Sequence, residues 1–181
     1  MKLTVRKMAV AGVLGAVSLV MGFVPALGLI PVPTPAQHAT ILHVPAILAG
    51  IAEGPVVGMV VGFIFGLVSL TRATIPAFAD PLVAILPRLF IGVLAAYSFM
   101  GLRRFGLMTG LIGAAVVGTL TNTVLVLSMM VVRDYLPAPA AVTVGILHGT
   151  PEVIVAAVIC AAVGAALYRA GFIPQRERRV A

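Results

Sequence analysis

The residues most able to do chemistry in this sequence are a few polar side chains that stand alone in long apolar runs. Arg88 lies in the stretch DPLVAILPRLFIGVLAAYSFM, and Asn122, His148 and Glu152 lie in two later apolar stretches. A charge inside hydrocarbon is costly unless it faces the interior of a helix bundle and finds a partner. A buried arginine favours a carboxylate or a phosphate as that partner. These residues therefore predict a buried polar site.

Helical geometry places these side chains in one layer. At about 1.5 Å of rise per residue, Arg88 lies roughly 10 Å and Asn122 roughly 16 Å from the outer ends of their helices. His148 and Glu152 lie roughly 10 and 16 Å from the outer end of the predicted helix 141–168. They share one face of that helix because they are four residues apart. His43 is expected near the outer end of the predicted helix 40–52. The inner halves of the helices are almost purely apolar, so the polar layer belongs to the outer half.

Two interpretations of this layer compete. In the first, Arg88 forms an ion pair with Glu152 that only ties two helices together. In the second, which is favoured, Arg88 binds an anionic group of a ligand from outside, and Glu152, Asn122 and His148 bind its other polar groups. Both hold in turn if Glu152 neutralises Arg88 until the ligand arrives. The further candidates for substrate binding are His43, Gln37, Arg72 and Phe78.

The composition indicates what kind of element positions these residues. Of the 181 residues, 61% are hydrophobic and only 9% are charged, whereas a soluble domain has about 25% charged residues. The chain is therefore predicted to be an all-α integral membrane protein with a single domain. The single cysteine, Cys160, allows no disulfide within the chain. The net charge of +7 is attributed to membrane topology, not to nucleic-acid binding.

Six membrane-spanning helices are predicted, because a span needs about 20 apolar residues. Their ranges are 4–24, 40–52, 55–70, 81–100, 107–132 and 141–168. This topology places nine of the twelve basic residues on one side: Lys2, Arg6, Lys7, Arg103, Arg104, Arg169, Arg176, Arg178 and Arg179. The positive-inside rule makes that side the cytoplasm, so both termini are predicted to be cytoplasmic. The first stretch is interpreted as a span and not as a signal peptide, since no clean cleavage site follows it.

Proline and glycine mark special positions in these helices. Pro151, in the stretch HGTPE, removes a backbone donor and predicts a break that lines a cavity; alternatively, the last helix begins at Thr150 as its cap. Four glycines spaced four apart predict close packing within the bundle: Gly54, Gly58, Gly62 and Gly66. The first helix holds two small-residue pairs, either of which suits an intermolecular contact: Ala11 with Gly15, and Gly12 with Ala16.

Several function classes lack their motifs here. There is no G-x-x-x-x-G-K-[ST] loop for ATP hydrolysis, no H-E-x-x-H and no cysteine pair for a metal. We therefore expect no enzyme activity, no cofactor and no metal site. A stand-alone secondary transporter or channel for a small organic anion is the alternative to a binding subunit. It would need paired repeats or ionisable residues across both halves of the membrane, and the polar layer stops halfway.

The ordered set of these features resembles the substrate-binding S components of energy-coupling factor (ECF) vitamin transporters, in the pantothenate/folate/riboflavin-like branch. The resemblance covers almost the whole chain and is carried by ILHVPAILAGIAEGPVVGMVVGFIFGLVSL, by DPLVAILPRLFIG and by the small-residue first helix. It implies capture of one micronutrient from outside, in a cavity that the loops after helices 1, 3 and 5 close. It also implies docking on a transmembrane coupling subunit that carries two ATPase subunits, in the bacterial cytoplasmic membrane.

The resemblance assigns the docking contact to the small residues of the first helix, either Ala11 and Gly15 or Gly12 and Ala16. The ligand is a separate question. Phe78 is a candidate for the lid of the cavity and the chain has no tryptophan, which disfavours a large flat ring such as flavin or folate. Pantothenate, small and with one carboxylate, is the predicted vitamin. Lipoate, biotin or a vitamin precursor are the alternatives. The remaining predicted partner is membrane lipid.

Overall fold

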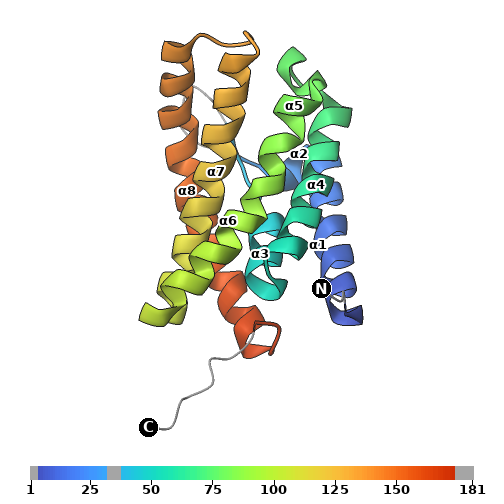
Figure 1. The fold of residues 1–181 in the computed structure, drawn as a ribbon, viewed down its shortest axis with the longest axis vertical. Coiled ribbons are helices and arrows are strands. Elements are labelled where there is room, and N and C mark those ends of the chain that lie inside the picture. Colours follow the sequence, from blue (N-terminus) through green and yellow to red (C-terminus); the bar gives the residue numbers. More distant parts are fainter. Residues whose placement is uncertain (1–3, 32–37, 174–181) are drawn as a thin grey trace.

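The computed structural model describes residues 4–31 and 38–173, which form a bundle of helices with one short β-ribbon (Figure 1). The α-helices are α1 (Val5–Phe23), α2 (Pro25–Gly28), α3 (Val44–Glu53), α4 (Pro55–Arg72), α5 (Pro81–Ala84), α6 (Leu86–Leu102), α7 (Leu107–Val132) and α8 (Ala138–Arg169). Two 3-10 turns, η1 (Pro76–Ala79) and η2 (Arg103–Phe105), flank the α5–α6 segment. Helices dominate, as the sequence predicts.

Five segments of the described chain are long and apolar enough to cross a membrane: Val5–Phe23, Pro55–Arg72, Pro81–Phe105, Leu107–Val132 and Ala138–Arg169. The predicted second span, 40–52, is different. Its helix, α3, has only ten residues, so it extends about 15 Å, half of a hydrocarbon core of about 30 Å. Residues 44–52 are all buried, because α3 lies inside the bundle. Six full crossings are therefore not confirmed.

A β-ribbon precedes α3 and was not predicted. Strands β1 (Leu29–Pro31) and β2 (His38–Thr40) pair antiparallel, with Leu29 opposite Thr40. The backbone N–H of Thr40 donates to Glu152 Oε1 at 3.0 Å, which ties the ribbon to α8. Thr40, which was predicted to begin the second helix, is thus the last residue of the ribbon. Gln37 lies outside the described residues.

The boundaries of two other predicted helices also change. The helix expected over 81–100 is divided at Ile85 into α5 and α6, because Pro87 lacks the N–H that would bond to the carbonyl of Val83. The last helix begins at Ala138, three residues earlier than expected, and continues through Pro151 to Arg169. The alternative in which it begins at Thr150 is therefore wrong, and so is the break at HGTPE.

The glycine stripe of α4 packs against α6, as predicted. A Cβ atom added at Gly58 would lie 2.8 Å from the backbone of Gly92, and one added at Gly66 would lie 2.9 Å from the Cα of Ile85. Backbone atoms cannot move aside, so only glycine permits this approach. Gly54 has another role. Its φ of +93° lies in a region that side chains rarely adopt, and it forms the turn between α3 and α4.

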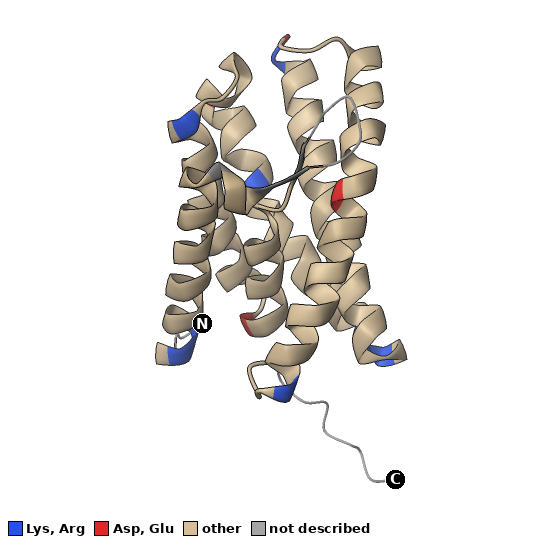
Figure 2. Cartoon of the chain, turned by 180° about the vertical axis from the view of Figure 1, so that it is seen from behind, with Lys and Arg blue, Asp and Glu red and all other residues tan. Residues whose placement is uncertain are grey.

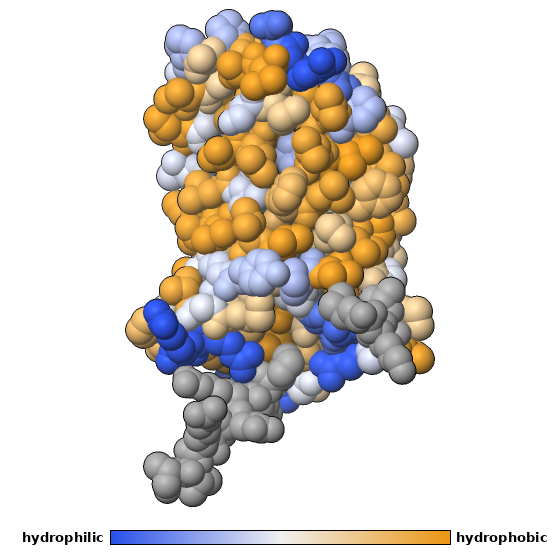
Figure 3. Space-filling model, viewed as in Figure 1, coloured by the Kyte–Doolittle hydropathy of each residue, from blue (hydrophilic) through white to orange (hydrophobic). Residues whose placement is uncertain are grey.

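The two ends of the bundle differ in charge. Lys and Arg gather at the end where α1 begins and α8 ends (Figure 2). Hydrophobic side chains cover most of the visible face between the ends, and hydrophilic ones gather toward the ends (Figure 3). A lateral surface of this kind suits contact with lipid. The protein is a multi-pass membrane protein.

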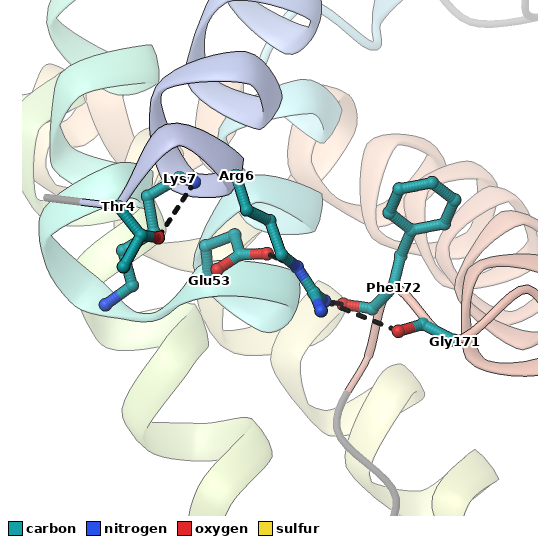
Figure 4. Close-up of polar contacts among 6 residues, drawn as sticks. All are labelled: Thr4, Arg6, Lys7, Glu53, Gly171 and Phe172. Atoms are coloured by element: carbon teal, nitrogen blue, oxygen red, sulfur yellow. Dashed lines mark hydrogen bonds and ion pairs between the residues drawn. The ribbon is translucent and has the colours of Figure 1, made fainter.

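Arg6 fastens three elements together at the basic end (Figure 4). Its Nε lies 2.6 Å from Glu53 Oε1, at the end of α3. Its Nη2 donates to the carbonyl of Phe172 at 2.5 Å and to that of Gly171 at 3.4 Å. Thr4 caps α1 just before it, since its hydroxyl accepts from the N–H of Lys7. These contacts fix the start of α1, the end of α3 and the turn after α8 relative to one another.

Candidate functional site

A cavity of about 580 Å³ lies among α4, α6, α7 and α8, toward the end of the bundle away from the described termini. Of the eight residues predicted to bind substrate, six line it: Arg72, Phe78, Arg88, Asn122, His148 and Glu152. Of the other two, Gln37 is outside the described residues and His43 lies elsewhere. The structure therefore brings together, around one space, side chains that are up to 80 residues apart in the sequence.

Arg88 is the most constrained of these residues. It is 3% exposed, and its Nη1 donates to the carbonyl of Val83 at 2.5 Å. Its guanidinium carbon lies 5.4 Å from the ring centre of Phe65 and 5.0 Å from that of Phe78. The aromatic faces attract the cation and confine the plane of the guanidinium. They do not neutralise its charge.

Arg88 does not form an ion pair with Glu152. The ion pairs of the described residues join Arg6 to Glu53 and Arg133 to Asp80. Glu152 instead accepts the backbone N–H of Thr40. The first interpretation, in which the two charges only tie helices together, is therefore wrong for this arrangement of the chain. Arg88 lines the cavity, and no carboxylate of residues 4–31 and 38–173 forms an ion pair with it.

The wall formed by α7 and α8 carries hydrogen-bonding atoms that have no partner in the described chain. They are Oδ1 of Asn122, Oγ1 of Thr123 and Nδ1 of His148, all of them buried. A buried polar atom left without a hydrogen bond costs about 1–3 kcal/mol, so native proteins seldom leave several together. Glu152, on the same wall, is only 6% exposed. This wall is suited to a ligand that supplies hydrogen-bond donors.

The opposite wall, formed by α4 and α6, is cationic. Arg88 and Arg72 lie on it, and the Nη1 of Arg72 donates to the carbonyl of Gly22 at the end of α1. Phe65 and Ser69 also line this wall and were missed by the sequence analysis. Together with Arg72 they recur at intervals of four and three residues along α4, the spacing of one helical face, which is a signal that the sequence does contain.

His43 supports the cavity from beneath. It is completely buried, and its Nε2 lies 2.9 Å from Oγ1 of Thr119. The bond joins the start of α3 to α7, while the adjacent Leu42 lines the cavity. The structure therefore places His43 in a supporting position next to the cavity and not among its lining residues.

Two loops at the end of the bundle away from the described termini form the roof of the cavity and are joined by an ion pair. Ile75 and Phe78 come from the loop before α5, and Leu136 comes from the loop before α8. The Nε of Arg133 lies 2.7 Å from Oδ2 of Asp80. This hydrogen bond holds the pKa of Asp80 below its ordinary value, and so does the N–H of Leu82, which Asp80 accepts as the predicted cap of α5.

The two small-residue pairs of α1 point in different directions. Gly15 is buried, and a Cβ added there would lie 2.6 Å from Cδ1 of Ile64 in α4. Gly12 and Ala16 are exposed, and nothing lies within 4 Å of a Cβ added at Gly12. The pair Ala11 and Gly15 therefore belongs to the side of α1 that packs inside the chain, and the pair Gly12 and Ala16 to its open side.

The fold is that of a multi-pass membrane protein, with a cavity that polar side chains line. The chain belongs to the ECF transporter family of substrate-specific components, whose family model matches residues 6–164. A solved structure described as "Structure and mechanism of the S component of a bacterial ECF transporter" has the same fold, with a TM-score of 0.59. It is 23% identical, and the match covers 93% of this chain and 98% of that one. No curated protein matches the chain.

This membership defines the role of the chain in general terms. It is the substrate-specific component of an ECF importer and binds a small molecule. Its family consists of transport subunits and not of enzymes. The family of the chain is thus the one predicted from the sequence.

Proposed function

We propose that this component captures a small anionic vitamin, pantothenate in the first place, and delivers it with an ATP-driven coupling module. The observation that carries the proposal is the cavity itself, in which a buried arginine without a carboxylate partner faces unpartnered polar atoms. Arg88 binds the carboxylate of the ligand, because a guanidinium and a carboxylate form charge-assisted hydrogen bonds. The site thereby selects an acid of limited size.

The other end of the ligand is bound by the wall of α7 and α8. Pantothenate has an amide N–H and two hydroxyl groups, and these donors suit the acceptor atoms of Asn122 and Glu152. The cavity of about 580 Å³ falls within the range of roughly 300–1,000 Å³ that is usual for small-molecule sites. Lipoate, biotin and vitamin precursors share the carboxylate and differ from pantothenate in the donors at the far end.

In the membrane, the basic end of the bundle is proposed to face the cytoplasm. The positive-inside rule supports this orientation, since Lys and Arg gather at that end. The cavity then opens toward the outside of a bacterial cytoplasmic membrane. The chain would enter the membrane six times, with α3 as a half-length element. The partners are a transmembrane coupling subunit, two ATPase subunits and the surrounding lipid.

A titration of the purified protein in detergent tests the ligand. Pantothenate, biotin, lipoate, riboflavin and folate are added separately, and calorimetry measures the binding of each. We expect pantothenate to bind one to one, and we expect Arg88→Ala to weaken its binding at least tenfold, since a hydrogen bond to a charged group contributes about 1.5–3 kcal/mol. Arg169→Ala, at the far end of α8, is the matched control and should bind normally.

Transport separates this function from its alternative. In liposomes, a substrate-binding subunit takes up pantothenate only with the coupling module and ATP. Uptake by this chain alone would contradict the proposal and support a stand-alone carrier. Equal affinity of the wild type and Arg88→Ala for pantothenate, with both variants folded, would contradict the role of Arg88.

A further inference from the structure

Pro87 has no N–H to offer to the carbonyl of Val83 in the α5–α6 segment. In an α-helix the carbonyl of residue i accepts the N–H of residue i+4, and the residue four after Val83 is Pro87, which has no N–H. The carbonyl of Ile85, two residues after Val83, accepts from the N–H groups of both Arg88 and Leu89, at 3.0 and 3.3 Å, so neither of these N–H groups serves the carbonyl of Val83. Val83 is completely buried, so its carbonyl needs another donor.

Arg88 supplies that donor. Side chains of a helix point toward its N-terminus, and the guanidinium of Arg88 therefore reaches back five residues to the carbonyl of Val83. This is the hydrogen bond that the side chain makes within the described residues, and the rings of Phe65 and Phe78 flank the same group. The backbone of Arg88 is fixed as well, because a Cβ at Gly62 would collide with its carbonyl.

We infer that Pro87 is a positioning residue for Arg88, and that it thereby sets the preference of the cavity for an anion. The inference rests on the proposed function, in which Arg88 binds the carboxylate of the ligand. Any other residue at position 87 would offer its own N–H to the carbonyl of Val83. The guanidinium would then have to share its acceptor with that N–H and would lose its fixed direction, so it would have to be ordered again each time a ligand binds.

The arginine N–H groups report on this tether without any ligand. The protein is labelled with 15N-arginine in detergent, and the signals of Arg88 are identified by their loss in Arg88→Lys. We expect the Nη protons of Arg88 to exchange slowly with water in the wild type and quickly in Pro87→Ala. Pro81→Ala is the matched control, because Pro81 is the first residue of α5, where a backbone N–H has no acceptor in the helix.

Pro87 is fully buried, so a second variant guards against misfolding. Pro87→Val fills more of the space than alanine and also restores the N–H, and we expect it to lose the slow exchange in the same way. Slow exchange of Arg88 that persists in both variants would overturn the inference. Fast exchange in the wild type would also overturn it.

Binding gives a second readout that a merely structural role would not produce. The probes are pantothenate and pantothenol, in which a CH₂OH group replaces the carboxylate. We expect Pro87→Ala to weaken pantothenate about tenfold, as loss of one hydrogen bond to a charged group would, and to leave pantothenol unchanged. In an Arg88→Ala background Pro87→Ala should add no further loss.

The outcomes separate the inference from the function on which it rests. An equal loss for both probes, or a loss that adds to that of Arg88→Ala, would show that Pro87 serves the fold in general and would overturn the inference. If the wild type does not bind pantothenate, the proposed ligand is contradicted, and the exchange of the Arg88 protons still decides the role of Pro87.

Discussion

Arg88 obtains its environment from three sources that lie at different distances along the sequence. Val83 is five residues before it, Phe78 is ten residues before it, and Phe65 comes from another helix. The sequence predicts that Arg88 is buried and binds a polar group, because a lone charge in an apolar run has few other options. It does not determine which group, since Glu152 was the alternative to a ligand until the structure placed the N–H of Thr40 on Glu152.

The polar residues that the sequence predicts best are those whose types are rare in apolar helices. Asn122 and His148 stand out for that reason, and both line the cavity. Val83 does not stand out, because an apolar residue in an apolar helix carries no signal of a special role, and Phe65 is marked only by its helical spacing from Ser69 and Arg72. Their contributions depend on an aromatic face and a backbone carbonyl, and only coordinates show where these lie.

At the residue scale, the ion pair of the roof predicts a dependence of stability on pH. The pKa of Asp80 is lowered in the folded state, chiefly by its hydrogen bond to Arg133. Its stabilisation is therefore complete above the unfolded-state pKa of about 3.9 and is lost as the pH falls below that value through the folded-state pKa. Asp80→Asn should lower the melting temperature at pH 6, and its difference from the wild type should shrink below about pH 4.

Melting curves between pH 3 and pH 7 measure this effect. Asp134→Asn is the matched control, because Asp134 is a neighbour of Arg133 that forms no ion pair in the described chain. A constant gap between the wild type and Asp80→Asn over the whole range would contradict the prediction.

At the element scale, the helices differ in how completely the sequence determines them. The length of the apolar run in the sequence predicts α7, whose bounds match the expected 107–132. It fails for the start of α3, because Ile41 and Leu42 before it are also apolar and periodicity does not distinguish so short a stretch from a helical turn. Pro87 shows a third case, since a proline one residue inside a helix is compatible with either a start or a bend.

The close contact between α4 and α6 leaves no room for a side chain at Gly58. Gly58→Ala would place a Cβ atom 2.8 Å from the backbone of Gly92, so the two helices would have to separate. We expect a loss of about 1–3 kcal/mol in the free energy of unfolding, as for other overpacked sites. Thermal or denaturant unfolding in detergent measures it.

Gly101→Ala is the control for this contact, since Gly101 lies in α6 and nothing is within 4 Å of the added Cβ. Alanine is the better helix former by roughly 0.8–1.0 kcal/mol, so this variant should be at least as stable as the wild type. Equal stability of Gly58→Ala and Gly101→Ala would contradict the close packing of α4 against α6.

At the scale of the whole molecule, α1 is the spanning helix with the smallest buried share among the described spans. It touches α3 and α4, and its other side is apolar and open. The family implies a contact with a coupling subunit, and the structure separates the two residue pairs between which the sequence could not choose. Gly15 faces Ile64 within the chain, whereas Gly12 and Ala16 face outward.

We therefore expect the coupling subunit to dock on the open side of α1, at Gly12 and Ala16. A leucine at Gly12 or Ala16 would project from the open side of α1 and prevent the close approach of another helix. We expect Gly12→Leu and Ala16→Leu to block co-purification with the coupling subunit and the two ATPase subunits, while ligand affinity stays at the wild-type value.

The control for this docking contact is Val124→Leu, since Val124 is exposed on α7, away from α1. This variant should assemble normally. Gly15→Leu should instead lower the melting temperature, because it collides with Ile64. Normal assembly of both Gly12→Leu and Ala16→Leu would exclude this side of α1 as the docking contact.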